Sequence, residues 1–311
     1  MQGMMLARAY FETYGRVMID EQFASYKPYM AVGLVGEGSE CFGYDDALSV
    51  DHDYGPGFCI WLPELIHRQV GDALQQAYER LPKDFGGHRR METTQAGKRV
   101  GVWSIEQFYE KYTGLTHPPR DNMEWFKIPE SFLAVATNGQ VFWDQPGMFT
   151  EWRNVLLRFY PEDVVKKKLA AKCAFMAQSG QYNYGRSMKR GDRYAAYLAC
   201  NLFVQNALAA IYLLNECYAP YYKWLFRGTE SLRSLTGAVE KLKALTELSD
   251  SPEQAPEKER LINSVCDDMV QALNNRGWTK TSASFLQHQA EELMRSIGDN
   301  RLRALHIMAD V

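Results

Sequence analysis

The sequence predicts an α+β fold, in which a small mixed sheet flanked by helices is followed by a helical bundle. Short apolar runs typical of strands occur only in the first half of the 311-residue chain. They lie at Ala31–Val35, Phe58–Leu62, Arg99–Ser104 and Gln140–Asp144. From Thr150 onward apolar residues recur at helical spacing instead. We therefore expect two domains, residues 1–160 and 161–311, with a boundary near Tyr160–Pro161.

Helices are expected between the strands of the first half. Residues 1–26 place Leu6, Tyr10 and Tyr14 on one side of a helix. The remaining predicted segments of this half are a helix at Glu64–Leu81 behind Pro63, an irregular loop or hairpin at Lys83–Gly97, and helices at Ile105–Tyr112 and Pro129–Thr137.

The second half reads as a succession of helices with short connections. Pro161–Ala177 predicts a helix with Lys166–Lys168 exposed, and Met188–Tyr218 is the longest apolar helical pattern. Further helices are expected at Leu232–Leu248, Lys258–Asn274 and Ser282–Ile297. A bundle is the simplest arrangement of these helices.

The segment from Ala31 to Leu62 carries the clearest chemical signal in the chain. After the first strand come Gly36, Gly38 and Ser39, where a turn lets the backbone approach a ligand and present N–H groups. A helix beginning near Ser39 would add its positive end, and the Ser39 hydroxyl is a further donor. This turn is therefore a candidate phosphate-binding site.

Two acids follow a dozen residues later. Asp51 and Asp53 share one face if they lie on a strand, and two such carboxylates repel each other unless a cation lies between them. Hard oxygen ligands of this kind suit Mg²⁺, which is commonly held by carboxylates and substrate phosphates. A clamped triphosphate beside such a metal is what nucleotidyl transfer requires.

The pattern G-S-x3-G-x5-S-x-D-x-D, from Gly38 to Asp53, resembles the signature of the polymerase beta type of nucleotidyltransferase. Kanamycin- and lincosamide-modifying members are nearest in style, although Val50 stands where serine or glycine commonly precedes the first aspartate. The wider segment, GEGSECFGYDDALSVDHDYGPGF, resembles a bacterial family of two-domain nucleotidyltransferase-like proteins of unassigned substrate. The later segment Tyr218–Trp224 resembles the helical half of that family.

The resemblance implies a nucleotidyltransferase domain at residues 1–160 and a helical bundle at 161–311 that completes the cleft. Asp51 and Asp53 would act in catalysis by holding Mg²⁺ or Mn²⁺, and Gly38 and Ser39 would bind the phosphates. The reaction would move a nucleoside monophosphate from an NTP, with ATP expected, to a hydroxyl-bearing acceptor. A third catalytic carboxylate often lies on a later strand, but here Val100–Val102 supplies none.

Other segments offer candidates for the missing groups. Asp144, at a strand end, is either an acid of the site or a helix cap. By resemblance, Glu216 is the candidate base and Lys223 reaches the nucleotide phosphates, whereas an ordinary surface glutamate and an aromatic helix junction are the alternatives. The basic loop with Arg186 and Lys189 either binds phosphate or is solvated.

Composition limits the choice of partner. The net charge is −3, which argues against a general affinity for nucleic acid or anionic membranes and favours a small-molecule acceptor. Six cysteines without a C-x-x-C pair indicate reduced, packed thiols. No window of 18 uncharged apolar residues occurs, so we expect no membrane span and a cytoplasmic protein. The sequence does not indicate an oligomeric state.

Two other functions fit the same motif. A nucleotidyltransferase of the toxin or antitoxin type would modify a protein or a tRNA instead of a small molecule. A non-catalytic nucleotide-binding protein would explain the absence of an acid at Val100–Val102.

Overall fold

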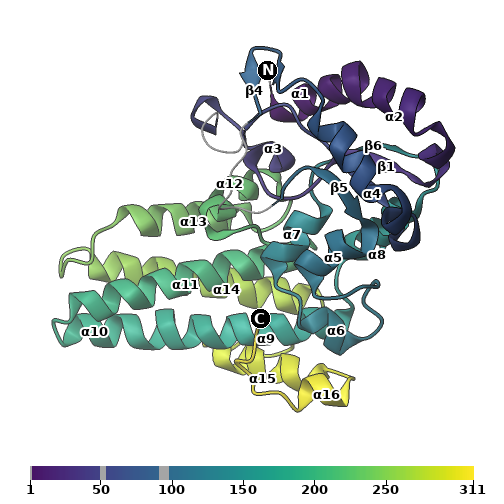
Figure 1. The fold of residues 1–311 in the computed structure, drawn as a ribbon. Coiled ribbons are helices and arrows are strands. Elements are labelled where there is room, and N and C mark those ends of the chain that lie inside the picture. The colour runs from purple at the N-terminus through teal and green to yellow at the C-terminus, as the bar shows by residue number, and fades with distance from the viewer. Residues whose placement is uncertain (1, 50–53, 91–97) are drawn as a thin grey trace. The chain divides into compact units, whose positions relative to one another are not determined.

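The computed structural model describes residues 2–49, 54–90 and 98–311 (Figure 1). It confirms the α+β class, with a small mixed sheet flanked by helices and a helical second half. The chain divides into two compact units. The sheet unit comprises Met1–Pro119 and Phe132–Arg158, and the helical unit comprises Arg120–Ser131 and Phe159–Val311. The assignment of a nucleotidyltransferase domain to residues 1–160 and of a cleft-completing bundle to 161–311 stays a prediction.

The four predicted strands form one sheet in the order β5-β2-β1-β6. Their bounds are Ala31–Leu34 for β1, Cys59–Leu62 for β2, Gly101–Ser104 for β5 and Gln140–Asp144 for β6. Strand β1 is antiparallel to both β2 and β6, and β2 pairs in parallel with β5. Every residue of β1 and β2 is buried, as expected of continuous apolar runs in central strands.

Helices and aromatic side chains cover this sheet. The expected helix over residues 1–26 is α1 (Gly3–Tyr10), a π-helical turn (Phe11–Gly15) and α2 (Arg16–Gln22), followed by a 3₁₀ segment. The other helices of the unit are α3 (Ser39–Phe42), α4 (Glu64–Glu79), α5 (Ile105–Thr113), α7 (Glu130–Thr137, whose first two residues belong to the helical unit) and α8 (Met148–Leu157). Short strands β3 (Asp84–Phe85) and β4 (His88–Arg89) form the expected hairpin. Tyr10, Phe11 and Phe58 pack together at the centre of the core.

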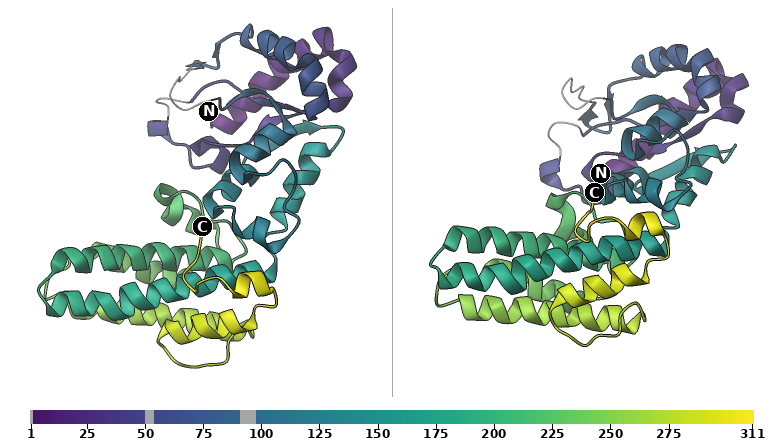
Figure 2. Two further views of the ribbon diagram at one scale, coloured as in Figure 1. Left: turned by 60° about the horizontal axis from the view of Figure 1, so that its bottom comes forward. Right: turned by 90° about the horizontal axis from the view of Figure 1, so that it is seen from below.

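Long helices form the helical unit. In Figure 2 the three longest, α9 (Glu162–Met176), α11 (Arg193–Leu214) and α14 (Ala255–Asn275), lie side by side. Its shorter helices are α6 (Asn122–Phe126), α10 (Gly185–Lys189), α12 (Leu225–Gly228), α13 (Thr236–Glu247), α15 (Leu286–Ser296) and α16 (Asn300–Arg303). Helix α11 begins five residues later than expected because the chain turns at Gly191, with φ +74°, and Asp192 caps the helix through the N–H of Ala195.

The lysines of α9 contradict the sequence prediction. Lys166–Lys168 were expected on a solvated face, but Lys167 and Lys168 have no exposed surface and Lys166 is 9 % exposed. Carbonyl and carboxylate oxygens of the segment 306–311 accept hydrogen bonds from Lys167 and Lys168, and Lys166 pairs with Glu162 at 2.5 Å. A contact about 140 residues away in sequence cannot be read from the local pattern of α9.

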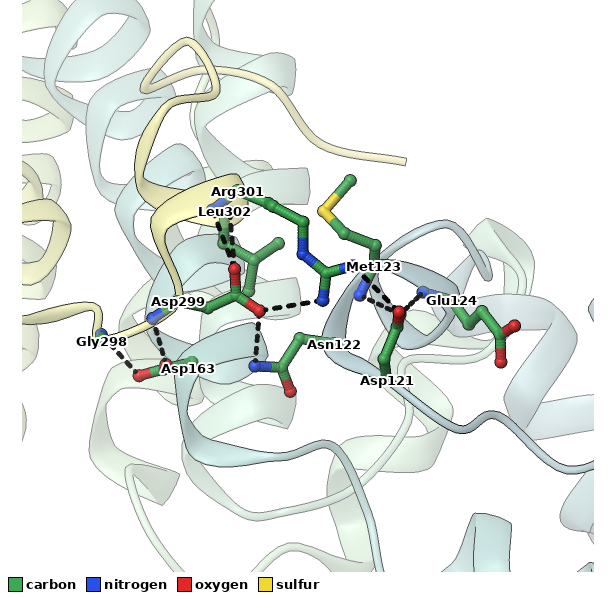
Figure 3. Close-up of polar contacts among 9 residues, drawn as sticks. All are labelled: Asp121, Asn122, Met123, Glu124, Asp163, Gly298, Asp299, Arg301 and Leu302. Carbon is green, nitrogen blue, oxygen red and sulfur yellow. Dashed lines mark hydrogen bonds and ion pairs between the residues drawn. The ribbon is translucent and has the colours of Figure 1, made fainter.

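A polar network holds α16 against α6 and the start of α9 (Figure 3). Arg301 pairs with Asp121 at 2.9 Å and with Asp299 at 3.3 Å. Asp163 accepts the N–H groups of Gly298 and Asp299, and Asn122 donates to the Asp299 carboxylate. The chain that leads into the segment 306–311 is therefore anchored within the helical unit.

Helix α11 qualifies as a membrane span by length and composition, and it is the one such helix among the described residues. The mean hydropathy of its window is 1.5, although polar Asn201, Gln205 and Asn206 interrupt the apolar run, and one such helix is weak evidence for a span. The expectation of no span stays a prediction. Within the unit 61 % of that window is buried, as is common for the core helix of a bundle.

The cysteines match the expectation of free, packed thiols. Cys41, Cys59, Cys173, Cys200 and Cys266 are buried, Cys217 is exposed, and all six are free. Burial raises the pKa of the Cys59 thiol to about 12. These thiols are therefore protonated and unreactive at neutral pH where buried.

Candidate functional site

The predicted strand, glycine turn and helix are present at residues 31–42. Strand β1 ends at Leu34, Gly36 and Gly38 adopt φ values of +131° and +118°, and α3 begins at Ser39. Residues that carry a side chain rarely adopt such backbone conformations, so glycine is favoured at both positions. Helix α3 has only four residues, so its positive end contributes less than the sequence suggested.

The turn is held by a distant asparagine. The Gly36 N–H donates to Oδ1 of Asn138 at 2.9 Å, and Nδ2 of Asn138 donates to the Gly36 carbonyl at 2.8 Å. The N–H of the next residue, Gly139, donates to the carbonyl of Cys41 at 2.8 Å. The connection before β6 therefore fixes both sides of the glycine turn.

Cationic side chains gather at the turn, and the sequence did not predict them. The Arg99 guanidinium donates to the Glu37 carbonyl at 2.5 Å and pairs with the Glu40 carboxylate at 2.6 Å. Both side chains of the Arg99–Glu40 pair are nearly buried, at 12 % and 11 % exposure. A side chain at Gly38 would overlap Nη2 of Arg99 and both Glu40 carboxylate oxygens, which gives a second reason for glycine there.

Two lysines extend this positive region. Nζ of Lys111 lies 2.9 Å from the Glu37 carboxylate and 5.6 Å from the ring centre of Trp103. Lys98 contacts the same Trp103 ring, with its Nζ 5.0 Å from the ring centre. Burial lowers the pKa of its ammonium group. Two basic side chains, Arg99 and Lys111, thus contact residues of the turn, and both are paired with glutamates.

Strand β5, which carries no acid at residues 101–102, pairs with β2, the next strand in the chain after Asp51 and Asp53. In this pairing Cys59 of β2 lies opposite Gly101 of β5. Gly101 has φ +103°, and a Cβ there would meet Oε1 of Gln75, which already accepts the Val102 N–H at 2.8 Å. A side chain at Gly101 would therefore collide with the Gln75 amide.

Asp51 and Asp53 lie outside the described residues, so the predicted metal pair stays a prediction. Among the residues that the structure describes, no group of three or more His, Cys, Asp or Glu is arranged to hold a metal ion. In the same stretch of sequence, Glu37 pairs with Lys111 and Glu40 pairs with Arg99. The Asp45 carboxylate accepts the N–H of Gly3.

Asp144 caps a helix. Its Oδ1 accepts the N–H of Gly147, and its Oδ2 accepts both the N–H and the hydroxyl of Thr150 at the start of α8. With both oxygens so bonded, Asp144 takes the alternative that the sequence left open, a cap rather than an acid of the site.

The segment with Arg186 and Lys189, expected to be a basic loop, is largely helical: a π-helical stretch (Ala177–Tyr184) runs into α10, and the chain turns only at residues 190–192. It does not lie beside Lys223. Arg186 is exposed and packs on Tyr182, with its guanidinium 4.7 Å from the ring centre, and Lys189 is exposed. Both precede α11, whereas Glu216 and Lys223 follow it. A 22-residue helix is about 33 Å long at 1.5 Å per residue, so one triphosphate cannot reach both ends.

Glu216 and Lys223 have different local surroundings. Glu216 has the unusual φ of +56°, and its carboxylate lies 3.2 Å from Arg276. Arg276 also lines a cavity of about 450 Å³, together with the ion pair of Lys241 and Asp268. Lys223 is exposed, with Nζ 4.8 Å from the ring centre of Trp224.

The tyrosines of this segment differ in their exposure to solvent. Tyr218 packs against Phe159 and Tyr160, with ring centres 4.9 Å and 5.2 Å away. Tyr221 and Tyr222 are 53 % and 66 % exposed, and their ring centres are 4.4 Å apart. These two are the more accessible for stacking on a base or acceptor, since Tyr218 is only partly exposed.

Comparisons with known proteins give limited information. Residues 125–225 match a family described as a domain of unknown function (DUF4037). No curated protein matches the chain. Among solved structures, the chain is similar to a nucleotidyltransferase-like protein from Exiguobacterium sibiricum 255-15, with a TM-score of 0.42 and 12 % sequence identity. The match covers 93 % of this chain and 81 % of that one. At this level the likeness carries no argument about activity.

Proposed function

We propose that the protein is a nucleotidyltransferase. It would move a nucleoside monophosphate from an NTP, with ATP as the expected donor, to a hydroxyl-bearing small molecule and release pyrophosphate. The observation that carries the proposal is the turn after β1, where the nucleotidyltransferase-like motif coincides with two glycines at positive φ.

The residues of the turn have separate roles in this proposal. Gly38, at positive φ, permits the turn that would present backbone N–H groups to a phosphate, and Ser39 would add a hydroxyl donor. Arg99 and Lys111 lie beside the turn in ion pairs with Glu40 and Glu37, so they would bind a phosphate by exchanging these carboxylates for phosphate oxygens.

Asp51 and Asp53 are the residues that would hold Mg²⁺ or Mn²⁺. The donor chemistry fits, because two carboxylates leave room for substrate phosphates in the coordination shell. The neighbouring Glu37 and Glu40 are already paired, so they add no ligand without breaking an ion pair. When bound, the metal would supply Lewis-acid stabilisation of the transferring phosphoryl group.

The helical unit would supply the remaining groups. Glu216 stays the candidate base, and its ion pair with Arg276 would orient its carboxylate. Lys223 stays a candidate for the phosphates, and Arg186 and Lys189 are candidates only for a different part of a ligand, because α11 separates them from Lys223. We place the reaction in the cytoplasm.

Pyrophosphate release from ATP and Mg²⁺ over a panel of hydroxylated small molecules tests the proposal. Asp51→Asn and Asp53→Asn should abolish transfer while circular dichroism and the thermal midpoint stay unchanged. Asp45→Asn is the matched control and should retain activity, since Asp45 stands at an unspecified position of the motif and its carboxylate accepts the N–H of Gly3. Turnover at the wild-type rate in either motif variant would falsify the assignment.

A second candidate, nucleotide binding without transfer, is favoured by Gly101. The strand position that commonly carries a third acid has none here, and Gln75 fills the adjacent space. Such a protein would bind ATP and Mg²⁺ with no pyrophosphate release for any acceptor. Label from α-labelled ATP appearing on a cellular protein or tRNA would instead identify a macromolecular acceptor.

A further inference from the structure

Three lysines on α9 meet a short distant segment inside the helical unit. Nζ of Lys167 donates to the carbonyls of Ile307 and Ala309 at 3.2 Å and 2.5 Å. Lys168 and Lys172 both bind Asp310: their Nζ atoms lie 3.2 Å from Oδ1 and 2.5 Å from Oδ2. One carboxylate thus bridges two ammonium groups while a third lies on the same segment.

A buried glutamate completes this cluster. Glu130 is 7 % exposed, and Nζ of Lys168 lies 3.8 Å from its Oε1, which is beyond hydrogen-bond distance. Within the described residues neither carboxylate oxygen of Glu130 accepts a hydrogen bond. Burial raises the pKa of Glu130, and the nearby lysines offset only part of that effect. A buried carboxyl without a hydrogen-bond partner is costly, and in its protonated form it could donate to another oxygen.

The ammonium groups of the cluster outnumber its side-chain carboxylates. Lys168 and Lys172 lie beside Glu130 and Asp310, whereas Lys167 bonds only to carbonyl oxygens, and Lys168 also donates to Val311 O at 3.4 Å. Without Asp310 the excess rises by one more charge. Buried ammonium groups require counter-charge, so removing Asp310 creates a demand for another anion.

The segment 306–311 is held by these polar contacts rather than by core packing. None of its six residues is buried, and no helix or strand extends past Arg303. The network of Arg301 with Asp121 and Asp299 anchors the chain just before it (Figure 3). Such a segment can leave the lysines without unfolding the helices that carry them.

We propose that Lys167, Lys168 and Lys172 form a phosphate-binding site in the helical unit, which the segment 306–311 occupies through Asp310 in this structure. The two oxygens of Asp310 mark the places of two phosphoryl oxygens, and a third oxygen would replace the carbonyls bound by Lys167. Glu130 would face the same group as a proton donor. The ligand class is a phosphate dianion, either free or as part of a nucleotide.

This inference goes beyond the proposed nucleotidyl transfer and does not depend on it, because the lysines and Asp51–Asp53 belong to different units. The Asp51→Asn variant should therefore bind phosphate like the wild type. Loss of phosphate binding in that variant would contradict the separate site.

Calorimetric titration of the full chain with inorganic phosphate, at constant ionic strength, tests the site. Asp310→Asn weakens the competing segment and should tighten phosphate binding by about tenfold, since apparent affinity scales with the population of the open state. Lys172→Gln should weaken binding by a similar factor. Lys243→Gln, at an exposed lysine paired with Glu240 on α13, is the control and should change nothing.

Hydrogen–deuterium exchange in residues 304–311 reports on the segment itself. Phosphate should increase exchange there, and Asp310→Asn should increase it without phosphate. If Asp310→Asn does not fold in phosphate-free buffer, its recovery by phosphate and not by chloride supports the site. Absence of phosphate binding in both wild type and Asp310→Asn, or equal release of the segment by chloride, would overturn the proposal. Binding of ATP without binding of free phosphate would assign the ligand to nucleotides.

Discussion

Asn138 binds both backbone polar groups of Gly36, accepting from its N–H at 2.9 Å and donating to its carbonyl at 2.8 Å. The two residues are 102 positions apart in sequence. A side-chain amide has one acceptor and one donor group to offer in this geometry, so few other side chains can satisfy both sides of the turn.

Asn138→Ala should therefore loosen the glycine turn. Losing both hydrogen bonds in a partly buried setting should cost about 1–3 kcal/mol of unfolding free energy, and ATP binding should weaken. Urea denaturation and ATP titration measure the two effects. Asn122→Ala, which removes one hydrogen bond to Asp299 in the helical unit, should leave ATP binding unchanged. Equal loss of ATP binding in both variants would argue against a role for the turn.

Gly38→Ala and Gly43→Ala separate backbone strain from contact at the turn. Both glycines have positive φ, but a Cβ at Gly43 meets no atom within 4 Å, whereas one at Gly38 overlaps Arg99 and Glu40. Gly43→Ala should cost about 1–2 kcal/mol from backbone strain alone. Gly38→Ala should cost clearly more and displace the Arg99–Glu40 pair. Similar denaturation midpoints for the two variants would show that the overlap relaxes freely.

The Arg99–Glu40 pair should be detectable as a coupled, nearly buried ion pair. Arg99→Met leaves Glu40 without its cation, which should destabilise the fold by about 3–5 kcal/mol. Adding Glu40→Gln should restore a large part of that loss, because the uncompensated charge is removed. A double-mutant cycle in urea measures the coupling. Additive effects of the two substitutions would mean that the pair contributes little beyond its separate contacts.

Lys167 predicts a specific pH dependence of stability. Burial lowers its pKa from the usual 10.5 to about 8 in the folded protein. Between these values the unfolded chain holds a proton that the folded chain has released, so this group makes stability rise with pH from about 8 to 10.5. Below pH 8 the cost of burying the charge is fully present.

The comparison of wild type with Lys167→Met isolates this contribution. Buried Cys59 and Tyr78 have raised pKa values, so they lower stability at high pH in both proteins and cancel in the difference. The difference in unfolding free energy should shift in favour of the wild type as the pH rises from 8 to 10. A constant difference across that range would show that Lys167 is charged and solvated in the folded protein.

Much of the fold followed from local patterns. Strands β1, β2, β5 and β6 lie within a residue or two of the predicted runs, because short buried strands are continuous apolar stretches bounded by turn residues. The sequence also predicted a turn that uses the glycines at positions 36 and 38, since these residues directly follow a buried strand. The predicted start of a helix was wrong where a capping side chain sets it, as at Asp192 before α11.

The surroundings of the candidate site could not be predicted in the same way. Arg99 reaches Glu40 across 59 residues because β5 pairs with β2, and nothing in the sequence near either residue indicates that pairing. The lysines of α9 show the same limit: their charge predicted exposure, but the segment 306–311 buries them.

The sequence by itself determined the α+β class, the strand and glycine turn at residues 31–39, and the motif that ends at Asp53, because these depend on spacing over a few tens of residues. Only the tertiary structure decided that Asn138 and Arg99 contact the turn, and that Asp310 pairs with Lys168 and Lys172 of α9. These contacts join residues about 60–140 positions apart, and their free energy comes from pairing buried polar groups that no local propensity specifies.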